Sequence, residues 1–104
     1  MRPPAPPRHL SSESKNVWRF WVRAADLDPD HLTLLRNMCE ANDRALQASE
    51  ILAREGLVGP DGKRHYCIDV ENAARAGYLR AQAQLSKAVA AMQKETRPKT
   101  WSIA

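Results

Sequence analysis

Two long segments without helix-breaking residues constrain this chain more than any other feature. Residues 29–55 contain no glycine and no proline beyond Pro29, and residues 69–94 contain one glycine and no proline. At 1.5 Å per residue, the first segment would form a helix roughly 40 Å long. Both segments predict long helices, and we therefore expect an all-α fold.

Signals at the ends of these segments indicate where the long helices begin and end. Asp28 is a good N-cap, Pro29 suits the first helical position, and Gly56 supplies a C-cap. Asp69 is expected to cap the second long helix, which should end near Lys94. These signals leave a short connection between the two helices.

This connection contains turn residues flanked by residues that favour strands. Residues 57–66 read LVGPDGKRHY, in which Gly-Pro-Asp-Gly is typical of a turn. Residues 57–58 and 66–68 flank the turn and are suited to pair across it. We therefore predict that a small β-hairpin joins the two long helices.

Small residues cover most of the second long helix. Nine of its positions between residues 73 and 91 are alanine or glycine. Small side chains let two helix backbones approach closely, so we expect this helix to pack against residues 29–55 as an antiparallel pair. Alanine is also the strongest helix former, which accounts for part of this number.

The N-terminal part of the chain divides into an arm and a short helix. Residues 1–10 are rich in proline and basic residues, and they predict an extended, disordered arm. A short helix should follow from about residue 13 to residue 25. Its three aromatic residues, Trp18, Phe20 and Trp21, should anchor it to the rest of the protein.

The predicted core is too thin for an isolated chain of this length. Apolar residues lie on more than one face of residues 29–55, and one helical neighbour can cover only one of these faces. We therefore expect a homo-oligomer. Residues 11–95 would form the helical oligomerisation domain, between the arm and a basic C-terminal tail of residues 96–104.

Several classes of protein are excluded by the sequence. No apolar run approaches the ~18 residues that cross a bilayer, and the N-terminus has no signal-peptide pattern, so we expect a soluble, intracellular protein with no membrane partner. No nucleophile motif, phosphate-binding loop or metal-ligand cluster appears. We therefore expect no enzyme, no catalytic or metal-binding residue and no cofactor. Cys39 and Cys67 are interpreted as small apolar side chains, because His65 and Cys67 alone are too few ligands for a metal.

Positive charge concentrates in the N-terminal arm, the connection and the C-terminal tail, whereas residues 12–55 carry six basic and eight acidic side chains. The chain has a net charge of +4, and a basic periphery favours contact with a polyanion. Three of the cations recur every four residues on the short helix, so they should project from one face. The alternative is that they are solvated side chains paired with nearby acids. The candidate DNA-binding residues are Lys15, Arg19, Arg23, Lys63, Arg64, Arg2 and Arg8.

The order of these features resembles a known family. The chain reads SSESKNVWRFWV over residues 11–22, then LDPDHLTLLRNMCEANDRALQASEILAREGL over residues 27–57, then the glycine-containing connection and the last helix. Over residues 10–92 it is similar to the P27-type small subunit of phage terminases. The matching positions are Trp18, Asp30, Leu34, Leu35, Cys39, Glu40, Ala41, Glu55, Gly56 and Leu57.

The resemblance implies a non-enzymatic DNA-packaging factor of a phage or prophage. Subunits of this family assemble into rings, bind double-stranded viral DNA and regulate the large terminase subunit, which carries the ATPase and nuclease. Such a protein would act during virion assembly in the host cytoplasm. The chain departs from the family at residues 65–67, which read His-Tyr-Cys where His-Pro is common. It also departs at residues 93–98, where a Gly-Leu-Thr-Pro-like turn is common.

Two other functions remain open from the residues. The first is a helical-hairpin adaptor that binds proteins and has no nucleic-acid role. The second is a small transcriptional regulator, in which the short helix and the start of residues 29–55 would form a helix-turn-helix. The acidic residues Asp28 and Asp30 disfavour the regulator, because they would repel phosphate at the start of its recognition helix.

Overall fold

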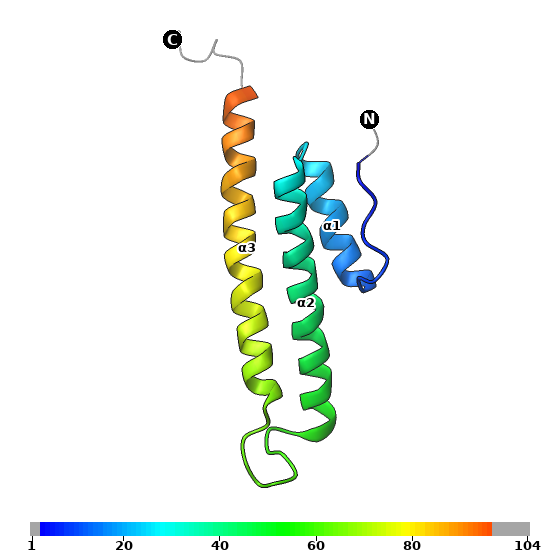
Figure 1. The fold of residues 1–104 in the computed structure, drawn as a ribbon, viewed down its shortest axis with the longest axis vertical. Helices are drawn as coiled ribbons and strands as arrows, with labels where there is room; N and C mark the ends of the chain where they lie inside the picture. Colours follow the sequence, from blue (N-terminus) through cyan, green and yellow to red (C-terminus); the bar gives the residue numbers. More distant parts are fainter. Residues whose placement is uncertain (1–2, 97–104) are drawn as a thin grey trace.

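A computed structural model describes residues 3–96 of the chain (Figure 1). Over these residues the protein is all-α, with α1 at Ser12–Ala24, α2 at Pro29–Glu55 and α3 at Cys67–Thr96. α2 and α3 lie antiparallel and side by side, and α1 lies along the N-terminal half of α2 (Figure 1). The predicted all-α class, with a short helix before two long antiparallel helices, is confirmed. None of the described helices is both long and apolar enough to cross a membrane.

α2 begins and ends where its capping residues predict. Oδ1 of Asp28 accepts the backbone N–H of His31 at 2.9 Å, and Pro29 is the first helical residue. At the other end, Gly56 has a φ of 83° and donates its N–H to the carbonyl oxygen of Leu52 at 2.8 Å. A left-handed φ favours glycine, so the presence of Gly56 correctly predicted where α2 ends.

α3 begins at Cys67, earlier than the predicted start, and Asp69 lies within its first turn instead of at the N-cap. The backbone N–H of Cys67 donates to Nδ1 of His65 at 3.0 Å. Since Nδ1 is an acceptor, Nε2 carries the proton and donates to Oε1 of Glu55 at 3.1 Å. The buried imidazole of His65 therefore caps α3 and ties its start to the end of α2.

The predicted β-hairpin is wrong. Within residues 3–96 there is no strand, and residues 57–66 contain one isolated bridge pair, Val58 with Arg64. Cys67 and Ile68, which were predicted in the second strand, belong to α3. The cap provided by the imidazole starts α3 directly after the loop, so too few residues remain outside the helix to extend the pairing.

The core lies where the three helices meet. Leu35 and Met38 of α2 and Leu85 of α3 are fully buried, and Trp18 of α1 is 5% exposed. Burial of these large apolar side chains is the main force that holds the short helix on the long pair. The cluster comprises Leu10, Trp18, Trp21, Leu35, Met38, Cys39, Ala81, Leu85 and Val89.

Alanine lets the two long helices approach closely. Ala41, Ala45 and Ala48 of α2 are buried, and so are Ala74 and Ala81 of α3. Most other alanines of α3 are exposed, so their contribution is helix propensity and not packing. The antiparallel pair therefore packs through small side chains beyond the part that α1 covers.

Residues 3–10 contain neither helix nor strand, yet they make more contacts than the sequence predicts. Nε1 of Trp18 donates to the carbonyl oxygen of Pro4 at 2.9 Å. Leu10 is 4% exposed and belongs to the core cluster. A buried indole N–H needs an acceptor, and the arm supplies it. No pattern in the sequence predicts this hydrogen bond between the arm and α1.

Candidate nucleic-acid interface

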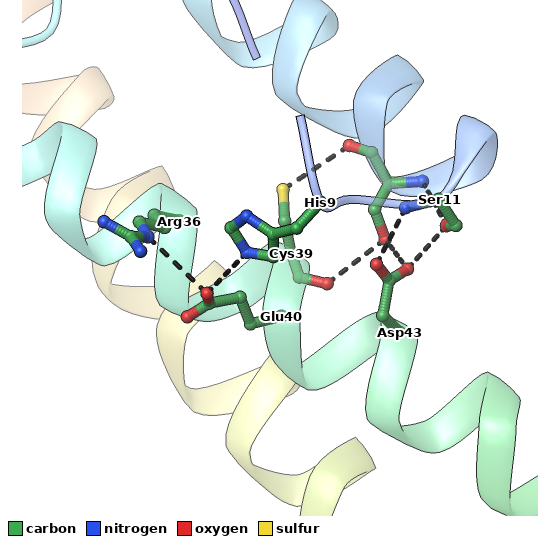
Figure 2. Close-up of polar contacts among 7 residues, drawn as sticks. His9, Ser11, Arg36, Cys39, Glu40 and Asp43 are labelled. Carbon is green, nitrogen blue, oxygen red and sulfur yellow. Dashed lines mark hydrogen bonds and ion pairs between the residues drawn. The ribbon is translucent and has the colours of Figure 1, made fainter. Parts of the chain in front are cut away.

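A polar network centred on Asp43 attaches α1 to α2 (Figure 2). Oδ2 of Asp43 accepts the backbone N–H of Ser11 at 2.8 Å, and Oδ1 accepts the hydroxyls of Ser11 and Ser14, both at 2.5 Å. Ser14 is fully buried, and its hydroxyl oxygen also accepts from Nδ2 of Asn42 at 3.0 Å. Ser11 is the N-cap of α1, so the network fixes the start of α1 against the middle of α2.

Asp43 is ionised in this network. Burial of its carboxyl favours the neutral form, but the hydrogen bonds from Ser11 and Ser14 outweigh burial and lower the pKa of Asp43 below its ordinary value of 3.8. The nearby imidazole of His9 lowers the pKa in the same direction. A carboxylate that accepts three hydrogen bonds is therefore part of the native structure.

Replacing Asp43 with asparagine should lower the free energy of unfolding by about 2 kcal/mol at pH 7, because hydrogen bonds to a charged acceptor are lost. The lowered folded-state pKa gives a stabilisation that is present above the unfolded pKa of about 4 and is lost as the pH falls further. The difference between wild type and Asp43→Asn should therefore shrink in urea melts at low pH. Asp26→Asn, which changes an exposed carboxylate, is the control. A pH-independent difference would contradict this role.

A second group of contacts joins the arm to α2. Nε2 of His9 lies 2.7 Å from Oε2 of Glu40, and Nε of Arg36 lies 3.5 Å from the same oxygen (Figure 2). Both contacts are at the surface, where such pairs contribute little stability individually. They nevertheless bring His9 and Arg36 to the same oxygen of Glu40, which joins the end of the arm to α2.

The outer side of α1 carries the three cations that the sequence singled out, here called the basic edge: Lys15, Arg19 and Arg23. Both arginines are exposed and Lys15 is half-exposed. Nη1 of Arg19 donates to Oδ1 of Asn16 at 3.1 Å, which holds the guanidinium along the helix. Within residues 3–96, none of the three forms an ion pair with a carboxylate. Their charge therefore faces solvent without a partner from this part of the chain.

Two of the other candidate cations, Lys63 and Arg64, lie apart from the basic edge. Lys63 and Arg64 are in the loop between α2 and α3, at the end of the molecule away from α1 (Figure 1). Nη2 of Arg64 pairs with Oδ1 of Asp69 at 3.0 Å, whereas Lys63 is exposed. Arg8 is exposed in the turn before α1, and Arg2 lies outside the described residues. One copy of the chain therefore presents two separate basic regions.

Phe20 is the residue of this surface that the sequence analysis missed. It was expected to anchor α1, but it is 65% exposed, whereas Trp18 and Trp21 are buried. Helical spacing carried the signal, since Phe20 lies four residues after Asn16 and three before Arg23 and so shares their face. Its ring meets Trp21 edge to face at 5.7 Å between centroids. The open groove beside it is lined by Asn16, Arg19, Phe20, Arg23 and Ala24.

Both thiols of the described residues are buried inside the helical bundle. Cys39 and Cys67 are buried and unpaired with each other. Burial, followed by the charges of Asp43 and Glu40, raises the pKa of Cys39 to about 12, so its thiol stays protonated at neutral pH. No group of three or more histidine, cysteine or acidic side chains in residues 3–96 is placed to hold a metal ion.

Comparison with known proteins adds no further constraint. No protein-family model, no curated protein and no solved structure matches the chain. The basic edge of α1 is the surface where charge, exposure and a fixed helix coincide.

Proposed function

We propose that this chain is a small terminase subunit of a phage or prophage, an oligomeric factor that binds double-stranded viral DNA and regulates the large terminase subunit during packaging. The observation that carries the proposal is the basic edge, whose three cations have no acidic partner among the described residues. The resemblance to the P27-type family supplies the biological setting.

The basic edge is suited to phosphate contact that does not depend on sequence. Lys15 and Arg23 are eight residues apart, which corresponds to roughly 12 Å along α1. Each cation that neutralises a phosphate releases counterions, and this release drives binding at low salt. Because the core tryptophans and the Asp43 network already fix α1, little ordering is needed on binding.

Exposed apolar side chains support the association of copies into a ring-like homo-oligomer. Leu57, Val58 and Tyr66 are 66%, 60% and 70% exposed around the loop, and Leu79 of α3 is 60% exposed. Large apolar side chains gathered on a surface mark contact sites with other chains. Association would also repeat the basic edge around the assembly, so that several weak DNA contacts act together.

The same apolar loop favours a second candidate, a helical-hairpin adaptor that binds other proteins and has no nucleic-acid role. Leu57, Val58 and Tyr66 would then be the binding surface, and Lys63 would contact an acidic neighbour. If the protein is an adaptor of this kind, the basic edge has no function in binding. A helix-turn-helix regulator has less support, because Asp26, Asp28 and Asp30 are all exposed where α1 leads into α2.

Light scattering coupled to size-exclusion chromatography tests the proposal. At micromolar concentration and low salt, the protein should elute as a discrete species of several subunits. Addition of a short duplex DNA should increase the mass of this peak by at least one duplex, and added salt should reverse the increase. A multimer that never takes up DNA would favour the adaptor. A monomer that takes up no DNA would contradict the proposal altogether.

A further inference from the structure

We propose that Phe20 is a base-stacking residue, so that the basic edge binds DNA with unpaired bases more tightly than continuous duplex. An unstacked base would lie on the exposed ring of Phe20, while Arg19 and Arg23 contact the phosphates on either side. This inference rests on the proposed DNA-binding function and adds a ligand class to the same surface.

Phe20 is exposed and yet held in place. Its side chain is 65% exposed, although it belongs to a helix whose other large aromatic residues are buried. The ring packs edge to face on Trp21, with an interplanar angle of 89°. Trp21 is itself 9% exposed and part of the core, so it is a rigid support. A fixed aromatic surface loses little conformational freedom when a flat ligand stacks on it.

Two positively charged side chains lie beside the ring of Phe20. Arg19 and Arg23 line the same groove as Phe20, and neither pairs with a carboxylate in residues 3–96. An apolar protein surface placed on Phe20 would desolvate both guanidinium groups without compensating them. A nucleic acid offers both a π-face for the ring and phosphates for the cations, within one nucleotide of each other.

Only bases whose faces are uncovered can stack on the ring of Phe20. In a continuous duplex, both faces of each base are covered by neighbouring bases, so a protein ring can reach a face only after unstacking. Unpaired bases are already free to stack on an aromatic side chain. The ring of Phe20 therefore contributes to binding of single-stranded DNA and contributes little to binding of duplex DNA.

The test compares the binding of three labelled probes by fluorescence anisotropy: an oligothymidine of roughly 20 nucleotides, a duplex of the same length, and polyglutamate of similar charge. Phe20→Ala should weaken binding of the single strand about tenfold and change binding of the duplex less than twofold. Phe20→Trp should retain single-strand binding. Gln84→Ala, which removes an exposed uncharged side chain from α3, is the control and should change neither.

Each outcome separates this inference from the proposed function. If wild type binds the duplex but Phe20→Ala weakens both DNA probes equally or not at all, base stacking is wrong and the proposed function stands. If wild type binds neither DNA probe at low salt, both proposals are wrong. If polyglutamate binds as tightly as the single strand, charge alone explains the surface and the base contact is overturned.

Discussion

Replacing Trp18 with alanine should lower the free energy of unfolding by about 3–5 kcal/mol. The indole is 5% exposed in the core where the three helices meet, so truncation leaves a cavity lined by residues of α2 and α3. The variant also loses the hydrogen bond from Nε1 to the carbonyl oxygen of Pro4, which ties the arm to α1. Urea denaturation followed by circular dichroism at 222 nm would measure the change.

Phe20→Ala is the matched control for this prediction, because it removes a large aromatic ring from the same helix. Phe20 is 65% exposed, so its loss should cost less than about 1 kcal/mol. Trp18→Phe should fall between the two, since it keeps an aromatic ring in the core but removes the indole N–H. Similar stabilities for Trp18→Ala and Phe20→Ala would contradict the anchoring role of Trp18.

The second large effect is expected on DNA binding. Changing Lys15, Arg19 and Arg23 together to alanine should weaken binding of duplex DNA about 100-fold at low salt, because three charge-assisted contacts of roughly 1 kcal/mol each are lost. The fold should persist, since none of the three side chains belongs to the core cluster or forms an ion pair with residues 3–96. Fluorescence anisotropy with a labelled duplex would give the dissociation constants.

A second triple variant separates the basic edge from net charge. Arg44, Arg80 and Lys87 lie on α2 and α3, are exposed, and form no ion pair with the described residues. Changing them to alanine removes the same charge from other surfaces. We expect less than a threefold loss of duplex binding from this control. Equal losses from the two triple variants would mean that total charge, and not the basic edge, determines binding.

The sequence predicted the long helices well because their ends carry local signals. Asp28, Pro29 and Gly56 define α2 through short-range capping, which a sequence displays directly. The start of α3 was missed because its cap is the imidazole of His65, which a search for the usual capping residues overlooks. The hairpin prediction failed for the same reason, since residues 67–68 favour strands but the cap places them in α3.

The candidate site was predictable in part. Helical spacing predicted that Lys15, Arg19 and Arg23 share one face of α1. Only the three-dimensional fold shows whether acidic side chains from elsewhere in the chain form ion pairs with them. The contacts of Asp43 with Ser11 and Ser14 join residues that are 32 and 29 positions apart, so no local pattern indicates them. Helical spacing could have predicted that Phe20 lies on the same face as Arg23. The prediction failed because Phe20 is next to Trp21 and near Trp18 in the sequence, and all three were expected to anchor α1.

The salt dependence of duplex binding tests the central claim, that the basic edge of α1 contacts DNA phosphates, most directly. Each phosphate contact contributes about −0.9 to the slope of log K against log salt concentration, where K is the association constant. Removal of Lys15, Arg19 and Arg23 should therefore make the slope shallower by about 2.7 for each copy of the basic edge that contacts the duplex, whereas the Arg44, Arg80 and Lys87 control should keep the wild-type slope. Identical slopes for wild type and the basic-edge variant would contradict the claim.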